Sequence, residues 1–173
     1  MLIDSLSFDD YHGMQESGLR VAIEDDVLTG SGTRQYAKME SKNKVRLIGL
    51  SILNTGQREL NLPADLVFET YNGDYIMPFV LEEAMEALID PVTDEENTSA
   101  IEIELSPGWK ILRSMGKGIN ESKTVISHVL FVEDMSAHYM ENWSLAPGES
   151  IKGYLVLPLR KGIPLKITLG SQL

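Results

Sequence analysis

The fold is decided by the stretch Val45-Arg46-Leu47-Ile48-Gly49-Leu50-Ser51-Ile52-Leu53, which Asn54-Thr55-Gly56 follows. Alternate residues of a β-strand point to opposite faces of its sheet, and both faces of this stretch are mostly apolar. The pattern predicts a central strand that is covered along most of its length. Asn and Gly tolerate positive φ, so the three residues that follow predict the turn that ends the strand.

The next two apolar runs predict a β-hairpin. Leu66–Tyr71 and Asp74–Phe79 flank Asn72-Gly73. Two β-prone runs around Asn-Gly are typical of a hairpin with a type I′ turn, in which both central residues have positive φ. Because proline cannot donate to a ladder, Pro78 indicates an edge position or the end of its strand.

A tight turn and two apolar strands are predicted to close the domain. The turn is Pro147-Gly148, and the strands are Ile151–Pro158 and Leu165–Leu169, with a turn between them at Arg160-Lys161-Gly162. Elsewhere, period-two alternation or β-prone composition predicts strands at Leu19–Glu24, Ile101–Leu105 and Thr124–Val132.

The middle of the chain has a different character. Leu81, Ala84, Met85 and Leu88 follow the helical i, i+3, i+4, i+7 spacing, which predicts a short amphipathic helix that ends before Pro91. The acidic stretch Thr93–Ser99 is interpreted as a loop. The pattern of Gly108–Gly118 is ambiguous, because apolar residues at helical spacing are interrupted by glycines.

Composition limits the classes of function. The chain has 15 Lys and Arg against 26 Asp and Glu, a formal net charge of −11. This balance argues against nucleic acid as a main partner and against docking of a polybasic face on an anionic membrane. The absence of cysteine removes disulfides, thiolate zinc sites and thiol catalysis. No run approaches the ~20 apolar residues of a transmembrane helix, and no signal peptide is visible at Met1.

Three of these patterns carry a family resemblance. They are the strand at 45–53 with its turn, the hairpin around Asn72-Gly73, and a closing pattern made of Leu145, Pro147, Gly148, Glu149, Gly153, Leu155, Leu157, Pro158, Leu165, Ile167 and Leu169. In these residues the chain resembles a bacterial family of immunoglobulin-like, telokin-like domains of unknown function, which occur in secreted and lipid-anchored proteins.

The resemblance implies a mainly β fold, namely an immunoglobulin-like antiparallel β-sandwich with a short helical insertion between strands. Residues 1–18 are then an N-terminal arm, and residues 19–173 are the sandwich, with the insertion at about 81–122. It also implies export or a place in the cell envelope, whereas a native start at Met1 favours the cytoplasm.

Catalytic and metal-binding patterns do not emerge. His12, His128 and His138 lack the short spacings of zinc ligands, so no metal or cofactor is expected. The loop Asp90–Asn97 has oxygens enough for calcium but lacks the spacing of a calcium loop, which leaves calcium binding open. Glu102 and Glu104 share one face of a predicted strand, and a carboxylate-based hydrolase would need one of them beside a pocket.

The residues chosen as candidate partner contacts are Trp109, His138, Tyr139 and Trp143, which fall in or beside irregular segments. Exposed aromatic side chains of this kind are typical of a protein or glycan interface. The leading hypothesis is therefore a non-enzymatic binding or accessory module of a bacterial cell envelope, which contacts a protein or glycan through the insertion. The alternatives are an intracellular interaction protein and the hydrolase. The partner and the oligomeric state stay open.

Overall fold

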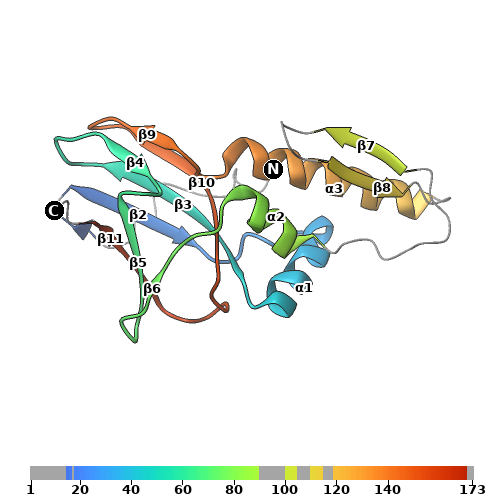
Figure 1. Cartoon of the computed structure of the whole chain (residues 1–173), viewed down its shortest axis with the longest axis horizontal. Helices are drawn as coiled ribbons and strands as arrows, with labels where there is room; N and C mark the ends of the chain where they lie inside the picture. The colour runs from blue at the N-terminus through green and yellow to red at the C-terminus, as the bar shows by residue number, and fades with distance from the viewer. Residues whose placement is uncertain (1–14, 17, 90–99, 105–109, 115–118, 171–173) are drawn as a thin grey trace.

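The computed structural model describes residues 15–16, 18–89, 100–104, 110–114 and 119–170 (Figure 1). This part of the chain is mainly β, with antiparallel sheets and three α-helices. The coarse prediction of a mainly β, antiparallel chain is therefore confirmed.

The strands form four antiparallel sheets within the described residues. The largest has the order β1 (Gln15–Glu16), β2 (Leu19–Glu24), β3 (Arg46–Asn54) and β10 (Ser150–Leu157). The second has the order β11 (Leu165–Leu169), β5 (Leu66–Thr70) and β6 (Tyr75–Ile76). Two pairs complete the set, β4 (Leu60–Leu62) with β9 (Trp143–Leu145) and β7 (Ala100–Glu104) with β8 (Lys110–Ser114).

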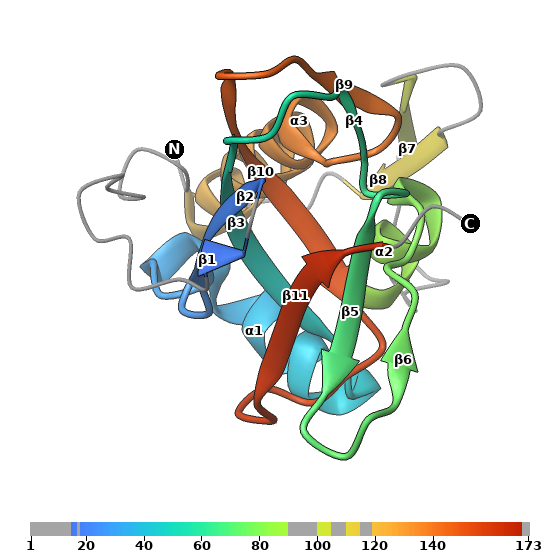
Figure 2. The same cartoon turned by 90° about the vertical axis from the view of Figure 1, so that its left-hand side faces the viewer.

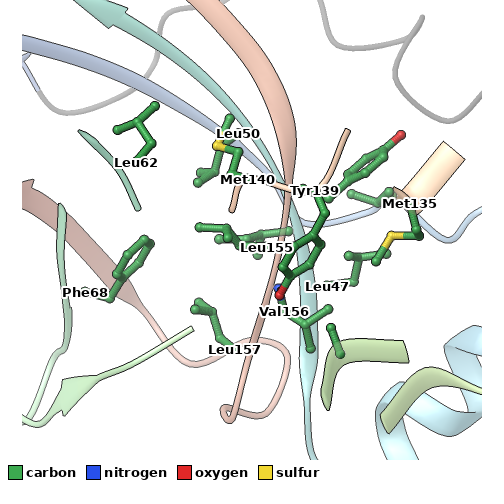
Figure 3. Close-up of a cluster of buried hydrophobic side chains, with 14 of the residues drawn as sticks. Leu47, Leu50, Leu62, Phe68, Met135, Tyr139, Met140, Leu155, Val156 and Leu157 are labelled. Carbon is green, nitrogen blue, oxygen red and sulfur yellow. The ribbon is translucent and has the colours of Figure 1, made fainter. Parts of the chain in front are cut away.

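Strand β3 is the centre of the largest sheet, and eight of its nine residues are buried. Its register places Ile48 opposite Leu155 and Leu47 opposite Val156 of β10, so the two pairs occupy opposite faces. Figure 3 shows Phe68 of β5 on one side of β10 and Met135 on the other. Both faces of β3 are thus covered, which confirms the predicted central strand.

The helices supply the cover on the second face. They are α1 (Arg34–Asn43), preceded by a 3-10 turn at Ser31–Thr33, α2 (Leu81–Leu88) and α3 (Ile119–His138). Helix α2 buries Ala84, Met85 and Leu88, as its spacing predicted. Helix α1 packs against α2, and α3 packs against β10.

The strand predicted at Thr124–Val132 is wrong, because α3 runs through it. The buried residues Phe131, Val132, Met135 and Tyr139 recur at helical spacing and form one apolar stripe. The ring of Phe131 stacks on that of Tyr36 in α1, with centroids 3.7 Å apart. Packing of this stripe against the sheet and α1 outweighs the β-propensity of the preceding residues.

The hairpin of β5 and β6 is confirmed, but its turn differs from the predicted type I′ turn. The amide of Gly73 donates to the Thr70 carbonyl (3.0 Å), and the amide of Thr70 donates to the Asp74 carbonyl (2.9 Å). Gly73 has φ 84°, while the described non-glycine residues with positive φ are Lys44 and Asn142. The connection is therefore a three-residue loop, Tyr71–Gly73, with glycine at its left-handed position.

The closing strands both form, and they belong to different sheets, since β10 pairs with β3 and β11 pairs with β5. The predicted Pro147-Gly148 turn is confirmed by φ 81° at Gly148 and a bond from the Glu149 amide to the Ala146 carbonyl. The buried Arg46 fixes the connection between β10 and β11. Its guanidinium donates to Asp25 and to the carbonyl of Ile163, which is in that connection.

The segments predicted from the sequence contain more secondary structure than an arm and a simple insertion. The arm at 1–18 ends in β1, which pairs with β2, and residues 1–14 lie outside the described residues. The stretch 81–122 contains α2, the β7–β8 hairpin and the beginning of α3. The predicted strand Ile101–Leu105 is present as β7, and the ambiguous segment Gly108–Gly118 contains β8.

Gly153 allows the chain to cover the outer edge of β10. The amide of Met140 donates to the Tyr154 carbonyl (2.9 Å), so the end of α3 lies against this edge. A Cβ atom at Gly153 would lie 2.5 Å from the carbonyl oxygen of His138 and 2.8 Å from Cγ of Met140. Only glycine fits at this position without a shift of the backbone.

We expect Gly153→Ala to lower the free energy of unfolding by about 2 kcal/mol, because the added methyl group meets a backbone carbonyl. Urea denaturation measures the change. Gly30→Ala is the matched control, since its Cβ would meet only Thr33 Oγ1 at 3.6 Å, and its effect should stay within about 0.5 kcal/mol. A Gly153→Ala variant as stable as the original chain would show that the end of α3 moves freely from β10.

Glu40 is a buried carboxylate at the end of α1. Its Oε1 accepts a hydrogen bond from the amide of Leu47 (2.8 Å). Burial raises the pKa of Glu40 above its ordinary value of 4.5, although the bond to Leu47 and the charges of Lys161 and Arg46 oppose the shift. A raised pKa in the folded state means that stability falls as pH rises through the folded pKa.

We expect Glu40→Gln to gain stability relative to the original chain as pH rises from about 4 to about 7. The amide keeps an oxygen for the Leu47 amide but carries no charge to bury. Urea denaturation across this range measures the difference in unfolding free energy. Glu133→Gln removes a charge at an exposed position of α3 and is the control. A difference for Glu40→Gln that stays constant with pH would contradict the stated cost of the buried charge.

Candidate interaction surface

Tyr139, one of the four predicted partner contacts, is a core residue that is 3% exposed. Its hydroxyl donates to the carbonyl of Phe79 (2.6 Å) and accepts from the amide of Val156 (3.1 Å). Burial raises the pKa of Tyr139, with a smaller contribution from the charges of Glu141 and Glu83. The side chain links three segments of the chain and has no surface for a partner.

His138 lies at the end of α3 and is partly exposed. Its Nδ1 is 3.0 Å from the carbonyl oxygen of Asp134 and 3.3 Å from Oδ1 of the same residue. The hydroxyl of Tyr154 donates to Oδ2 of Asp134 (2.9 Å), and the rings of His138 and Tyr154 lie edge to face. Asp134 therefore orients the imidazole and fastens the end of α3 to β10.

The two tryptophans of the prediction are not shown as exposed contacts. Trp143 is half-buried in β9, opposite Leu62 of β4, and packs against the core. Trp109 lies outside the described residues. The structure brings His138 and Tyr139 together at the end of α3, but Trp143 belongs to a different pair of strands.

In the part of the chain whose burial the structure describes, four of the six large exposed apolar side chains lie on or shortly after the β5–β6 hairpin. Tyr71 is 87% exposed, Tyr75 77%, Met77 82% and Val80 47%. We call these four residues the hairpin surface. Sequence reasoning missed it, because Tyr71, Met77 and Val80 lie outside the strands, where apolar periodicity does not predict exposure.

The hairpin surface has a rigid support. Tyr71 is in the three-residue loop, and Tyr75 is on β6, which is an edge strand of its sheet (Figure 2). Behind Met77, the amide of Phe79 donates to the carbonyl of Val156 (2.9 Å), and the Phe79 carbonyl accepts from Tyr139. These two bonds fasten the segment between β6 and α2 to β10 and to Tyr139, so Met77 and Val80 lie beside a fixed residue.

Exposed groups of large apolar residues distinguish interaction sites from ordinary surface. The other large exposed hydrophobics of the described residues, Leu130 and Ile163, stand apart on α3 and on the connection between β10 and β11. Tyr and Met are enriched at protein interfaces. The hairpin surface is therefore the candidate interaction surface.

Metal binding and carboxylate-based hydrolysis have less support in the described residues than an interaction surface. In the part of the chain that the structure describes, no group of three or more His, Asp or Glu could hold a metal ion. Glu102 and Glu104 are alternate residues of β7, as the sequence predicted, and the loop Asp90–Asn97 lies outside the described residues. Among the described helices, none is both long and apolar enough to cross a membrane.

Comparison with known proteins found no family model, no curated protein and no solved structure that matches the chain.

We expect Tyr139→Phe to lower the free energy of unfolding by about 1–3 kcal/mol, because the Val156 amide and the Phe79 carbonyl lose a buried partner. Tyr75→Phe removes the same hydroxyl at an exposed position and should change stability by less than about 0.5 kcal/mol. Thermal and urea denaturation of the two variants measure the difference. Equal effects at the two positions would contradict the role given to the Tyr139 hydroxyl.

Proposed function

We propose that the chain is a non-enzymatic protein-binding module and that its partner docks on the hairpin surface. The observation that carries the proposal is the exposure of Tyr71, Tyr75 and Met77 on one hairpin, each at 77% or more. Burying such side chains is favourable by about 25 cal/mol per Å² of apolar surface. A fixed backbone under them lowers the entropic cost of docking.

An immunoglobulin-like β-sandwich is the architecture that we propose for the core. Leu66 and Phe68 of β5 and Ile167 of β11 are buried, and β11 also contacts β2 of the largest sheet. Two antiparallel sheets that bury their facing side chains are typical of a sandwich. The helices α1, α2 and α3 are additions to that architecture.

The proposed setting follows the family resemblance, and it is a bacterial cell envelope in which the module is an accessory to a larger assembly. An intracellular partner would use the same surface and the same chemistry. The proposal differs from the sequence-based hypothesis in its contact surface, which moves from the insertion and the aromatic residues near His138 to the hairpin.

A photo-crosslinking amino acid placed at Tyr75 tests the proposal in cells that express the protein. We expect one defined crosslinked protein at this position, because the docked partner lies within reach of the side chain. The control position is Gln57, an exposed residue in the turn before β4. Tyr71→Ser should abolish the crosslinked band, since it removes apolar area from the same surface.

Two results would overturn the proposal. One is the absence of a discrete crosslinked protein at Tyr75, and the other is an identical band at Gln57. Unfolding of the variants serves as a check on the fold, and Tyr71→Ser should change the unfolding free energy by less than about 0.5 kcal/mol because the residue is exposed.

A further inference from the structure

The negative charge of the chain is concentrated in one segment. Between Arg58 and Lys110 there are 13 Asp and Glu and no Lys or Arg. The remainder of the chain has 13 Asp and Glu against all 15 Lys and Arg. The net charge of −11 thus arises entirely from the segment that contains the hairpin surface and α2.

Within this segment, exposed carboxylates lie next to the residues of the hairpin surface along the chain. Asp74 is in the hairpin beside Tyr75, and Glu82, Glu83 and Glu86 are exposed on α2, which begins directly after Val80. None of these four carboxylates has an ion pair with a residue that the structure describes. Their charges are available to a partner.

The apolar residues at the end of the hairpin lie close to the acidic residues of α2 along the chain. Tyr75 and Val80 are five positions apart, a stretch that spans at most about 18 Å when extended. Glu82 and Glu83 lie in the first turn of α2. The acidic character continues behind them, because Glu141 accepts a hydrogen bond from the amide of Leu81 (3.0 Å) and its charge, like that of Glu83, raises the pKa of Tyr139.

We propose that the partner presents a segment in which apolar side chains are flanked by Lys or Arg, an inference that rests on the proposed function. The apolar residues bury Tyr71, Tyr75 and Met77, and the cations face Asp74, Glu82, Glu83 and Glu86. Complementary charges of this kind steer association and select partners. Exposed pairs add little to affinity individually, but several charges of one sign act together over a Debye length of about 10 Å.

The same charges argue against other occupants of this surface. A second copy docked through a two-fold axis brings the same patch of each copy together, so the unpaired carboxylates would face one another. An anionic bilayer repels the acidic border in the same way. A basic partner is the occupant that gains from both features of the surface.

A displayed library of random 12-residue peptides tests the inference. Selection against the full chain, with counter-selection against Tyr75→Ser/Met77→Ser, should enrich peptides that combine apolar residues with net positive charge. Fluorescence anisotropy of the enriched peptides should give dissociation constants that rise about tenfold or more between about 50 and about 300 mM NaCl.

Two charge variants provide the matched comparison. Glu82→Gln/Glu83→Gln should weaken peptide binding about fivefold or more at low salt and reduce its salt dependence. Glu133→Gln/Glu149→Gln removes the same charge from exposed positions on α3 and before β10, and it should bind as the original chain does.

The outcomes separate the two proposals. Enriched peptides that are neutral or acidic, yet fail to bind Tyr75→Ser/Met77→Ser, would overturn the basic partner and leave the hairpin surface in place. Equal weakening by the two charge variants would also overturn it. Selection of no peptide that depends on Tyr75 and Met77, or a salt-dependent dimer that Tyr71→Ser dissolves, would overturn both the basic partner and docking of a different protein on the hairpin.

Discussion

The arrangement of this chain depends on how the outer edge of β10 is covered. An uncovered edge strand exposes amides and carbonyls that pair with other chains or require water. Here the edge receives the end of α3 through the Met140–Tyr154 bond, and the segment before α2 through the Phe79–Val156 bond. The hydroxyl of Tyr139 joins the two segments by binding both Phe79 and Val156. One buried hydroxyl thus holds the end of α3, the segment before α2 and β10 together. Gly153 leaves room for the end of α3 to approach β10.

The central strand could be predicted from the sequence, because a continuous apolar run depends on burial alone. The residues of β3 are apolar on both faces and are buried on both. The Asn72-Gly73 turn and the Pro147-Gly148 turn follow from local backbone preferences. The type of turn at the hairpin could not be predicted from these preferences. Thr70 pairs with Asp74, which places only Gly73 at a positive φ and leaves Asn72 at an ordinary negative φ. The pairing register of the two strands therefore determines the length of the loop, and this register depends on tertiary structure.

Helices α1 and α3 could not be predicted from local sequence patterns. Residues 124–132 are rich in β-branched and aromatic types, but the apolar stripe of α3 becomes visible only when Met135 and Tyr139 are included in the same window. Helix α1 has a polar sequence in which Tyr36, Met39 and Glu40 are buried, and no prediction covered it. In the same way, Tyr139 has the composition of a contact residue and the environment of a core residue. The hydroxyl partners that decide between these roles lie 60 and 17 positions away in the chain.

Tyr139 and Tyr75 have opposite environments. The Tyr139 hydroxyl is enclosed by two backbone groups, whereas the Tyr75 side chain is 77% exposed. The covering of β10 links them, because the bonds at Phe79 that complete the core also fix the backbone that presents Met77 and Val80 to solvent. Exposed apolar groups on a backbone held in this way lose little entropy on docking. The hydrogen bonds at Phe79 therefore serve both the core and the part of the proposed docking surface that follows β6.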